Sequence, residues 1–337
     1  MAGFDFKHFF IFEMANNHQG SLEHGKRIIK ELADVAQKAG VRAAIKFQFR
    51  DLDTLIHPSY RESAINKHIA RFLSTRLSEK QFSELAREAW KRNLITMATP
   101  FDELSVDMIE RLGIDVVKVA SSSAQDWPLL ERVALVGKPV VCSIGGFTLE
   151  QIDKTVRFFR EQKTDFALMH CVAMYPVPAE KLHLDQIEVM RKRYPDITIG
   201  FSTHEDPGNF AVVGMAYAKG ARLFEKHVGI PTDTIKLNGY SATPDQVLNW
   251  LAAYKEAVKI CGEGERKIEE KEKEDHRSLM LGVYAKKLLK AGSVLKRQDV
   301  FFAMPLLSGQ LASSQWREEL RADKDYDLNH PLNETLA

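Results

Sequence analysis

Eight short apolar runs recur over residues 9–227, and nearly every run stops on a polar residue that can do chemistry. Each run is followed by a segment in which apolar residues have helical spacing. Eight strand–helix units predict a (β/α)8 TIM barrel, an α/β fold in which the carboxyl ends of the strands share one mouth and carry the active site. The predicted strands are residues 9–13, 43–48, 94–99, 115–121, 139–143, 166–170, 197–204 and 222–227.

The composition changes after the eighth predicted strand. A helix over residues 244–261, with Thr243 as its N-cap, is expected to close the barrel. Residues 263–277 are almost entirely charged, which is typical of a solvated linker or an exposed helix. Beyond them, β-like runs broken by turn residues indicate a small β-rich module. These runs are residues 279–285, 290–293 and 299–302. We therefore expect a barrel domain at 1–262, a charged linker at 263–278 and a second domain at 279–337.

Charge and hydropathy exclude several classes of partner. The 47 Lys and Arg against 46 Asp and Glu give a net charge of +1, which provides no general attraction to nucleic acid or anionic membranes. No apolar stretch approaches the roughly 18 residues that span a bilayer, and the N-terminus lacks a signal-peptide pattern, so a cytoplasmic protein is expected. Cys142, Cys171 and Cys261 lack metal-motif spacing and are expected to be reduced and buried.

Polar side chains at the predicted strand ends indicate an anion site. Lys46 and Gln48 are two apart on one strand and face the same side, and Lys118 ends another strand. Two inward lysines suggest an anionic ligand, although each lysine could instead pair with a core carboxylate such as Glu13 or Glu225. Hydroxyls at four further strand ends can bind phosphate or carboxylate oxygens. They belong to Thr99, Ser121, Ser143 and Ser202.

Two histidines follow the seventh and eighth predicted strands. His204 and His227 are therefore expected to lie close together, and neutral imidazoles suit a divalent transition metal. Glu13, at the end of the first strand, lies beside the eighth once the barrel closes and could serve as acid or base. His170 is either a further site group or a satisfied internal residue, whereas Lys226 points away and is expected to be structural.

Eight motifs follow one another along the chain. They are Phe12-Glu-Met-Ala-Asn-Asn-His-Gln-Gly, Lys46-Phe-Gln, Ala98-Thr-Pro-Phe-Asp, Lys118-Val-Ala-Ser, Ser143-Ile-Gly-Gly, His170-Cys-Val, Gly200-Phe-Ser-Thr-His and Glu225-Lys-His. In this order they resemble the motifs of the N-acetylneuraminate (sialic acid) synthase family over residues 9–262. Residues 283–305 also look like the start of the family's antifreeze-like, or SAF, module.

The resemblance implies a synthase that condenses phosphoenolpyruvate with an aldose to give a 3-deoxy-2-ulosonic acid and phosphate. It implies that His204 and His227 bind a divalent metal, Mn²⁺ first, with Co²⁺, Mg²⁺ or Zn²⁺ as alternatives. It implies that Glu13 is the acid or base that transfers protons during the reaction. It also implies a homodimer in which the subunits exchange their SAF modules. The residues assigned to substrate binding are Lys46, Gln48, Thr99, Lys118, Ser121, Ser143, Tyr175, Ser202, Glu225 and Asn238.

The departures from the family pattern concern the acceptor sugar. Ala173 replaces a family Asn, and the loop after the eighth strand lacks the usual acid and offers only Asn238. Met304 stands where the family's SAF module has an arginine, and the segment 51–77 lacks the usual sugar-binding pattern. Loss of hydroxyl partners changes specificity strongly, so a variant acceptor is expected.

Three other functions compete with this reading. They are a synthase of another 2-keto-3-deoxy sugar acid, a non-catalytic sugar-acid-binding or regulatory homologue, and a metal-dependent hydrolase. The last usually needs a His-X-His pair ending the first strand, and this sequence has none there.

Overall fold

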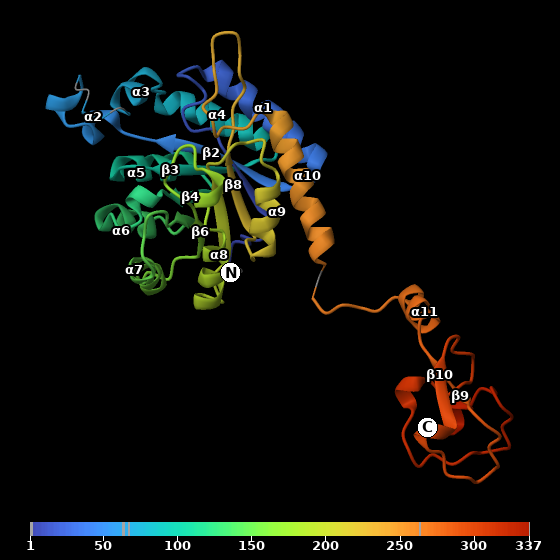
Figure 1. The fold of residues 1–337 in the computed structure, drawn as a ribbon. Coiled ribbons are helices and arrows are strands. Elements are labelled where there is room, and N and C mark those ends of the chain that lie inside the picture. Colours follow the sequence, from blue (N-terminus) through green and yellow to red (C-terminus); the bar gives the residue numbers. More distant parts are fainter. Residues whose placement is uncertain (1–2, 63–64, 67, 263, 337) are drawn as a thin grey trace. The chain divides into compact units, whose positions relative to one another are not determined.

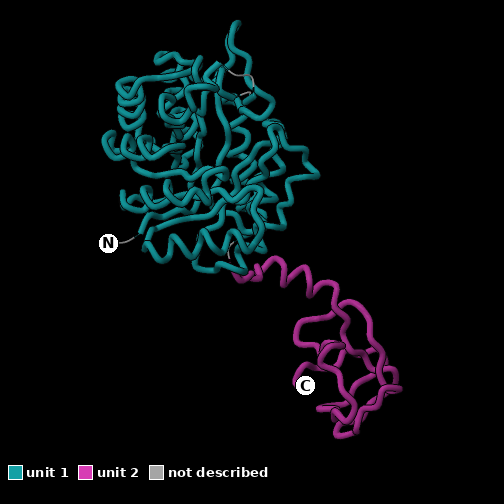
Figure 2. Tube along the Cα trace, turned by 90° about the vertical axis from the view of Figure 1, so that its left-hand side faces the viewer, with its two compact units in different colours: residues 1–262 teal, residues 263–337 magenta. Residues whose placement is uncertain are grey.

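The computed structural model of the chain (Figure 1) describes residues 3–62, 65–66, 68–262 and 264–336. Glu263, the first residue of the predicted linker, lies outside the described residues. The chain divides into two compact units, Met1–Gly262 and Glu263–Ala337, which Figure 2 colours separately. Within the described part of the chain, no helix is long and apolar enough to cross a membrane.

The first unit is a closed barrel of eight parallel strands in sequence order, with helices around it (Figure 1). The predicted (β/α)8 fold is confirmed. The strands are β1 Phe9–Glu13, β2 Arg42–Phe49, β3 Ile95–Pro100, β4 Val116–Val119, β5 Val140–Ser143, β6 Phe166–His170, β7 Ile199–Thr203 and β8 Leu223–His227.

Helices follow the strands and begin at residues suited to capping. In α4, α7 and α10 the N-cap hydroxyl accepts from the backbone of a Gln three residues on, whose side chain bonds back to the cap. The barrel-unit helices are α1 Leu22–Ala39, α2 Leu52–Leu55, α3 Ile69–Ser74, α4 Glu79–Lys91, α5 Glu103–Leu112, α6 Trp127–Leu135, α7 Leu149–Glu161, α8 Asp185–Arg193, α9 Ala211–Ala218 and α10 Pro244–Cys261.

The barrel closes where β1 pairs with β8, and α10 covers this seam. Phe10 of β1 stacks on Phe224 of β8 with ring centroids 5.8 Å apart. Trp250 and Tyr254 of α10 meet Phe10 edge-on at 5.6 and 4.8 Å. The predicted helix 244–261, capped by Thr243, is thus confirmed and forms the apolar cover of the closure.

The second unit has a small core of its own around the antiparallel pair β9 Gly282–Ala285 and β10 Val300–Ala303. Tyr326 is fully buried in this core. The charged segment before it contains the exposed helix α11 Glu270–Ser278. The β-like run predicted at 290–293 is wrong, because Gly292 and its neighbours form a turn with Gly292 at φ +81°.

Two further expectations are corrected by the barrel. The fourth strand ends at Val119, and Ser121 opens a 3-10 helix, η2 Ser121–Ser123, because the backbone N–H of Ser123 bonds back to Ala120. Cys142 and Cys171 are buried free thiols as predicted, but Cys261 is exposed because it lies in the last turn of α10.

Candidate active site

One cavity of about 1190 Å³ opens at the carboxyl ends of the barrel strands. The strand order brings every residue assigned to catalysis, metal binding or substrate binding to its wall, although these residues are spread over the whole barrel sequence. They are Glu13, Lys46, Gln48, Thr99, Lys118, Ser121, Ser143, Tyr175, Ser202, His204, Glu225, His227 and Asn238.

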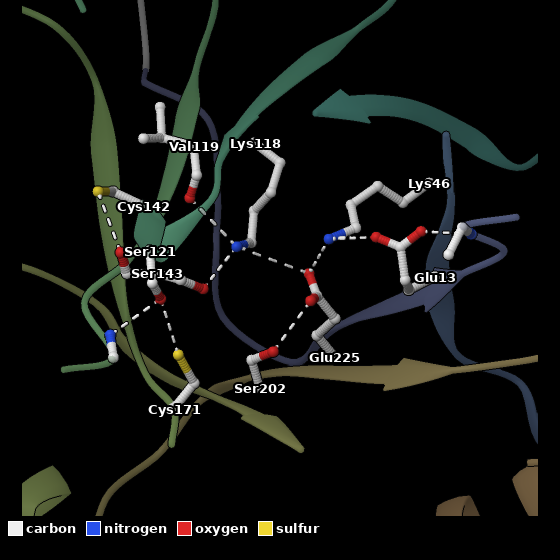
Figure 3. A network of polar contacts seen from close by, with 12 residues as sticks. Glu13, Lys46, Lys118, Val119, Ser121, Cys142, Ser143, Cys171, Ser202 and Glu225 are labelled. Carbon is white, nitrogen blue, oxygen red and sulfur yellow. Dashed lines mark hydrogen bonds and ion pairs between the residues drawn. The ribbon is translucent and has the colours of Figure 1, made fainter. Parts of the chain in front are cut away.

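Lys46 lies between two carboxylates at the base of this cavity (Figure 3). Its Nζ is 2.5 Å from Glu13 Oε2 and 2.8 Å from Glu225 Oε2, and all three side chains are almost fully buried. The register explains the first pair, because Glu13 is directly opposite Lys46 across β1 and β2. Burial opposes the charge, but Glu13 and Glu225 outweigh it and raise the pKa of Lys46. The alternative of a lysine paired with core carboxylates therefore holds for Lys46.

Lys118 is less fully compensated than Lys46. Its Nζ bonds to Ser143 Oγ at 2.5 Å and to the Val119 carbonyl at 3.3 Å, while its nearest carboxylate, Glu225, is 4.0 Å away. Burial lowers the pKa of Lys118. Despite its own burial, Glu225 has a pKa well below the usual range because Lys118 and Lys46 face it. A second anion in the cavity would complete the partners of Lys118.

Hydroxyl groups line the same floor and differ in what they bind. Ser202 donates to Glu225 Oε1 at 2.9 Å, and Ser121 accepts from the Gly145 N–H at 2.9 Å and contacts Cys171 Sγ at 3.0 Å (Figure 3). Thr99 Oγ1 is buried and has no hydrogen-bond partner among the described residues. A buried hydroxyl that lines a cavity and has no protein partner can bind an oxygen of a ligand or of an ordered water.

His204 and His227 meet as predicted, with ring centroids 5.2 Å apart. Burial lowers the pKa of His204 to about 4, and burial with the neighbouring His204 lowers that of His227 well below its usual value. Both imidazoles are thus neutral at pH 7 and able to donate a lone pair. In the described ranges no third His, Cys, Asp or Glu joins them in a metal-binding cluster.

Glu13 lies directly opposite His227 across β1 and β8. Burial raises the pKa of Glu13, although Lys46 opposes the shift. Its Oε1 accepts the Ala15 N–H at 2.5 Å, which fixes the carboxylate beside the lysine and the histidine pair. This position satisfies the geometric requirement for a group that exchanges protons with a substrate in the cavity.

Two tyrosines border the histidine pair, and only one was predicted. Tyr175 lies 4.5 Å from the ring of His204, and Tyr240 lies 5.0 Å from the ring of His227. The two tyrosine rings are 5.6 Å apart. Tyr240 was missed because its loop after β8 shows no periodic pattern, although its distance of two residues from the predicted Asn238 was a usable signal.

Sequence reasoning also missed the basic residues Arg50 and Arg71, which line the cavity together with His57 and Cys171. Arg50 follows Gln48 by two residues, so the alternation of a strand could have found it. In the segment 51–77, Tyr60 and His68 line the cavity, whereas Arg61 pairs with Asp53 at 3.1 Å.

The contacts of His170 and Lys226 show which of the predicted roles each residue has. His170 Nε2 contacts the Leu182 carbonyl at 2.8 Å and does not line the cavity, so it is a satisfied internal residue. Lys226 faces away from the barrel interior and pairs with Glu205 at 2.8 Å, with both side chains buried. Ala173, at the position of the family's Asn, does line the cavity and offers no polar atom there.

Comparisons with known proteins agree with this arrangement. The crystal structure of a Chromobacterium violaceum protein described as spore coat polysaccharide biosynthesis protein E superposes with a TM-score of 0.91 at 43% identity, covering 98% of this chain and 99% of that one. N-acetylneuraminic acid synthetase of Leptospira borgpetersenii gives a TM-score of 0.69 at 29% identity over 80% of this chain and 90% of that one.

A relative identified by sequence covers nearly the whole chain. Pseudaminic acid synthase of Campylobacter jejuni is 28% identical over 98% of this chain and 97% of its own length. The model of the NeuB family matches residues 32–266, which include β2 to β8 and both histidines. Two of the relatives named here, from Campylobacter jejuni and Leptospira borgpetersenii, are synthases of sugar acids. The match of the family model over most of the chain shows that this chain belongs to the NeuB family.

Proposed function

We propose that this enzyme condenses phosphoenolpyruvate with an aldose to give a 3-deoxy-2-ulosonic acid and phosphate. The observation that carries the proposal is the pairing, in one cavity, of a buried lysine short of counterions with two adjacent neutral imidazoles. A multiply charged enol ester needs the first feature, and activation of an aldehyde needs the second.

The anionic end of phosphoenolpyruvate would lie against the floor of the cavity. Lys118 supplies the charge, and Ser143, Ser121 and Thr99 supply hydroxyls toward the phosphate and carboxylate oxygens. Gln48, opposite Thr99 in the β2–β3 register, adds an amide to the same layer. Ser202 and Glu225 position the lysines. Glu225 forms ion pairs with Lys46 and Lys118, and it accepts a hydrogen bond from Ser202.

The residues present fit a divalent metal. His204 and His227 are adjacent and neutral, which is the state that coordinates transition ions, and the cavity leaves room for water or substrate as further ligands. We assign Mn²⁺ first, with Co²⁺, Mg²⁺ or Zn²⁺ as alternatives. When bound, such an ion would polarise the acceptor aldehyde.

Glu13 is assigned the proton transfers. As C3 of phosphoenolpyruvate bonds to the aldehyde carbon, the aldehyde oxygen takes the proton of Glu13, whose pKa burial raises, and C2 becomes electron-poor and takes up water. Glu13 is held beside Lys46 and opposite His227, where its carboxylate can accept the proton of that water. The bond between C2 and the phosphate oxygen then breaks, and the new C2 hydroxyl gives its proton to the leaving phosphate as it becomes the keto oxygen. Lys46 and Lys118 stabilise the charge of the released phosphate.

The acceptor would lie toward the tyrosines. Tyr175 and Asn238 line that part of the wall, and Tyr240 adds a second ring. We further assign residues 279–337 as an antifreeze-like (SAF) domain that is exchanged in a homodimer, after the charged linker at 263–278. A cytoplasmic location suits a reaction that consumes phosphoenolpyruvate.

The test measures phosphate release from phosphoenolpyruvate with Mn²⁺ and a panel of aldoses, with mass spectrometry of the products. We expect one or more aldoses to give a product heavier than the acceptor by the added pyruvate unit. His204→Ala and His227→Ala should abolish both signals while circular dichroism stays unchanged. Binding of phosphoenolpyruvate without phosphate release from any aldose would instead indicate a non-catalytic sugar-acid-binding protein.

A further inference from the structure

Arg50 places a cation in the upper part of the cavity, above the layer of Lys46 and Gln48. It follows β2 directly, and residues 46, 48 and 50 alternate so that all three line the cavity. Its Nη2 donates to Gln48 Oε1 at 2.7 Å. At about 3.3 Å per residue, Arg50 starts roughly 13 Å further along the strand than Lys46.

The guanidinium of Arg50 is held in place by two aromatic rings. Its central carbon lies 4.0 Å from the ring centroid of Phe72 and 3.8 Å from that of Phe101, and both rings line the cavity. Stacking on aromatic faces leaves the edge of the planar group, with its N–H donors, free to bind. Such a group is preorganised for an anion that arrives from the cavity.

Arg50 has no ion-paired carboxylate among the described residues, and Glu13 and Asp102 favour its charge only from beyond ion-pairing distance. Burial lowers its pKa to about 10, which still leaves it charged at neutral pH. Among the described residues no carboxylate lies within ion-pairing distance of it, in contrast to Lys46 with its two glutamates. A half-buried cation without a partner is costly unless a ligand supplies the partner.

Further basic side chains line the same cavity as Arg50. Arg71, from the segment between β2 and α4, also lines the cavity. Its guanidinium donates hydrogen bonds to Gln19 Oε1 and to the Asn16 carbonyl, and neither acceptor is an acid. His57 and His68 also line the cavity. The acids of the cavity, Glu13 and Glu225, are occupied by the lysines of the floor.

We infer that Arg50 binds an anionic substituent of the acceptor, so that the preferred aldose carries a carboxylate or a phosphate group. This inference rests on the proposed function, because the small enol ester occupies the lysines of the floor and leaves Arg50 to the second substrate. The planar guanidinium suits both anions, since each presents two oxygens to its paired N–H donors.

The test uses matched sugars titrated into the metal-loaded protein: mannose, mannuronate and mannose 6-phosphate. We expect one or both anionic sugars to bind about 10- to 100-fold more tightly than mannose, the range of one charge-assisted hydrogen bond. Mannuronate and mannose 6-phosphate distinguish a carboxylate from a phosphate. Equal affinity for all three, including no measurable binding of any, would overturn the inference.

Arg50→Gln should abolish the preference for the anionic sugar, and Arg50→Lys should keep part of it. The affinity for phosphoenolpyruvate, titrated separately, should change less than about threefold in both variants, within the effect of a distant charge. Arg61→Gln is the matched control, because Arg61 belongs to the same segment but pairs with Asp53 outside the cavity.

A variant that loses phosphoenolpyruvate affinity while the sugar preference persists would assign Arg50 to the wrong substrate. The two proposals fail separately. If the wild-type protein does not bind phosphoenolpyruvate, the proposed function is wrong. If it binds phosphoenolpyruvate but does not distinguish the three sugars, only the inference about Arg50 is wrong.

Discussion

The barrel wall contains two buried groups of lysine and glutamate side chains, one outside the strands and one facing the cavity. Lys226 and Glu205 form a closed pair outside the strand ring, with 1% and 2% of their side chains exposed. Lys46 and Lys118 face inward with Glu13 and Glu225, beside a cavity that is open to ligands. Lys226 has its counterion without a ligand, although Glu205 Oε2 is buried with no hydrogen-bond partner among the described residues, whereas the inner group leaves Lys118 short of partners. Burial alone therefore does not identify a binding lysine, but incomplete compensation beside a cavity does.

The largest expected effect lies in the outer pair. Glu205→Gln leaves the Lys226 ammonium buried without its counterion and should destabilise the barrel by about 3–5 kcal/mol. Thermal denaturation followed by circular dichroism measures this loss. Glu79→Gln removes one partner of the exposed pair with Arg111 and should cost less than about 1 kcal/mol. Equal midpoints for the two variants would show that the outer pair is not structural.

Lys118→Met should affect substrate binding and leave the stability of the barrel nearly unchanged. Removing an incompletely paired buried ammonium costs little stability, so the melting temperature should stay level or rise. The KM for phosphoenolpyruvate should rise about 10- to 100-fold, because one charge-assisted contact is lost. Steady-state kinetics and a melting curve on the same preparation check both. A lower melting temperature with an unchanged KM would make Lys118 structural, like Lys226.

The smallest expected effect separates the two inner lysines by pH. The lowered pKa of Lys118 means that it loses its proton, and its hold on an anion, earlier than Lys46 as pH rises. The KM for phosphoenolpyruvate should therefore increase on the alkaline side. Lys118→Arg stays charged there and should move that increase to higher pH. An alkaline limb at the same pH in both proteins would assign the titration to another group.

Much of this arrangement could be predicted from the sequence because strand periodicity and helix caps are local signals. The strands Phe9–Glu13 and Phe166–His170 and the helix Pro244–Cys261 were predicted at the bounds that the structure gives. Barrel topology then brought His204 and His227 together, since neighbouring strands end at one mouth. The roles assigned to these residues stay predictions.

What could not be predicted depends on contacts between distant segments. The sequence suggested carboxylate partners for the lysines as an alternative, but only the register of β1, β2 and β8 puts Lys46 between Glu13 and Glu225. The guanidinium of Arg50 is held in the cavity by Phe72 and Phe101, which come from two different segments of the chain. The turn at Gly292 was mistaken for a strand because a small module has few periodic residues.

The pairing of β1 with β8 has a consequence for synthesis of the chain. The ribosome finishes Phe9–Glu13 long before Leu223–His227, and at typical elongation rates roughly 10–40 s separate them. During that interval the free side of the first strand offers its backbone N–H and C=O groups to any other extended segment. The nascent barrel is thus an open sheet with a reactive margin, and only arrival of the eighth strand and the Trp250-bearing helix ends its exposure to aggregation.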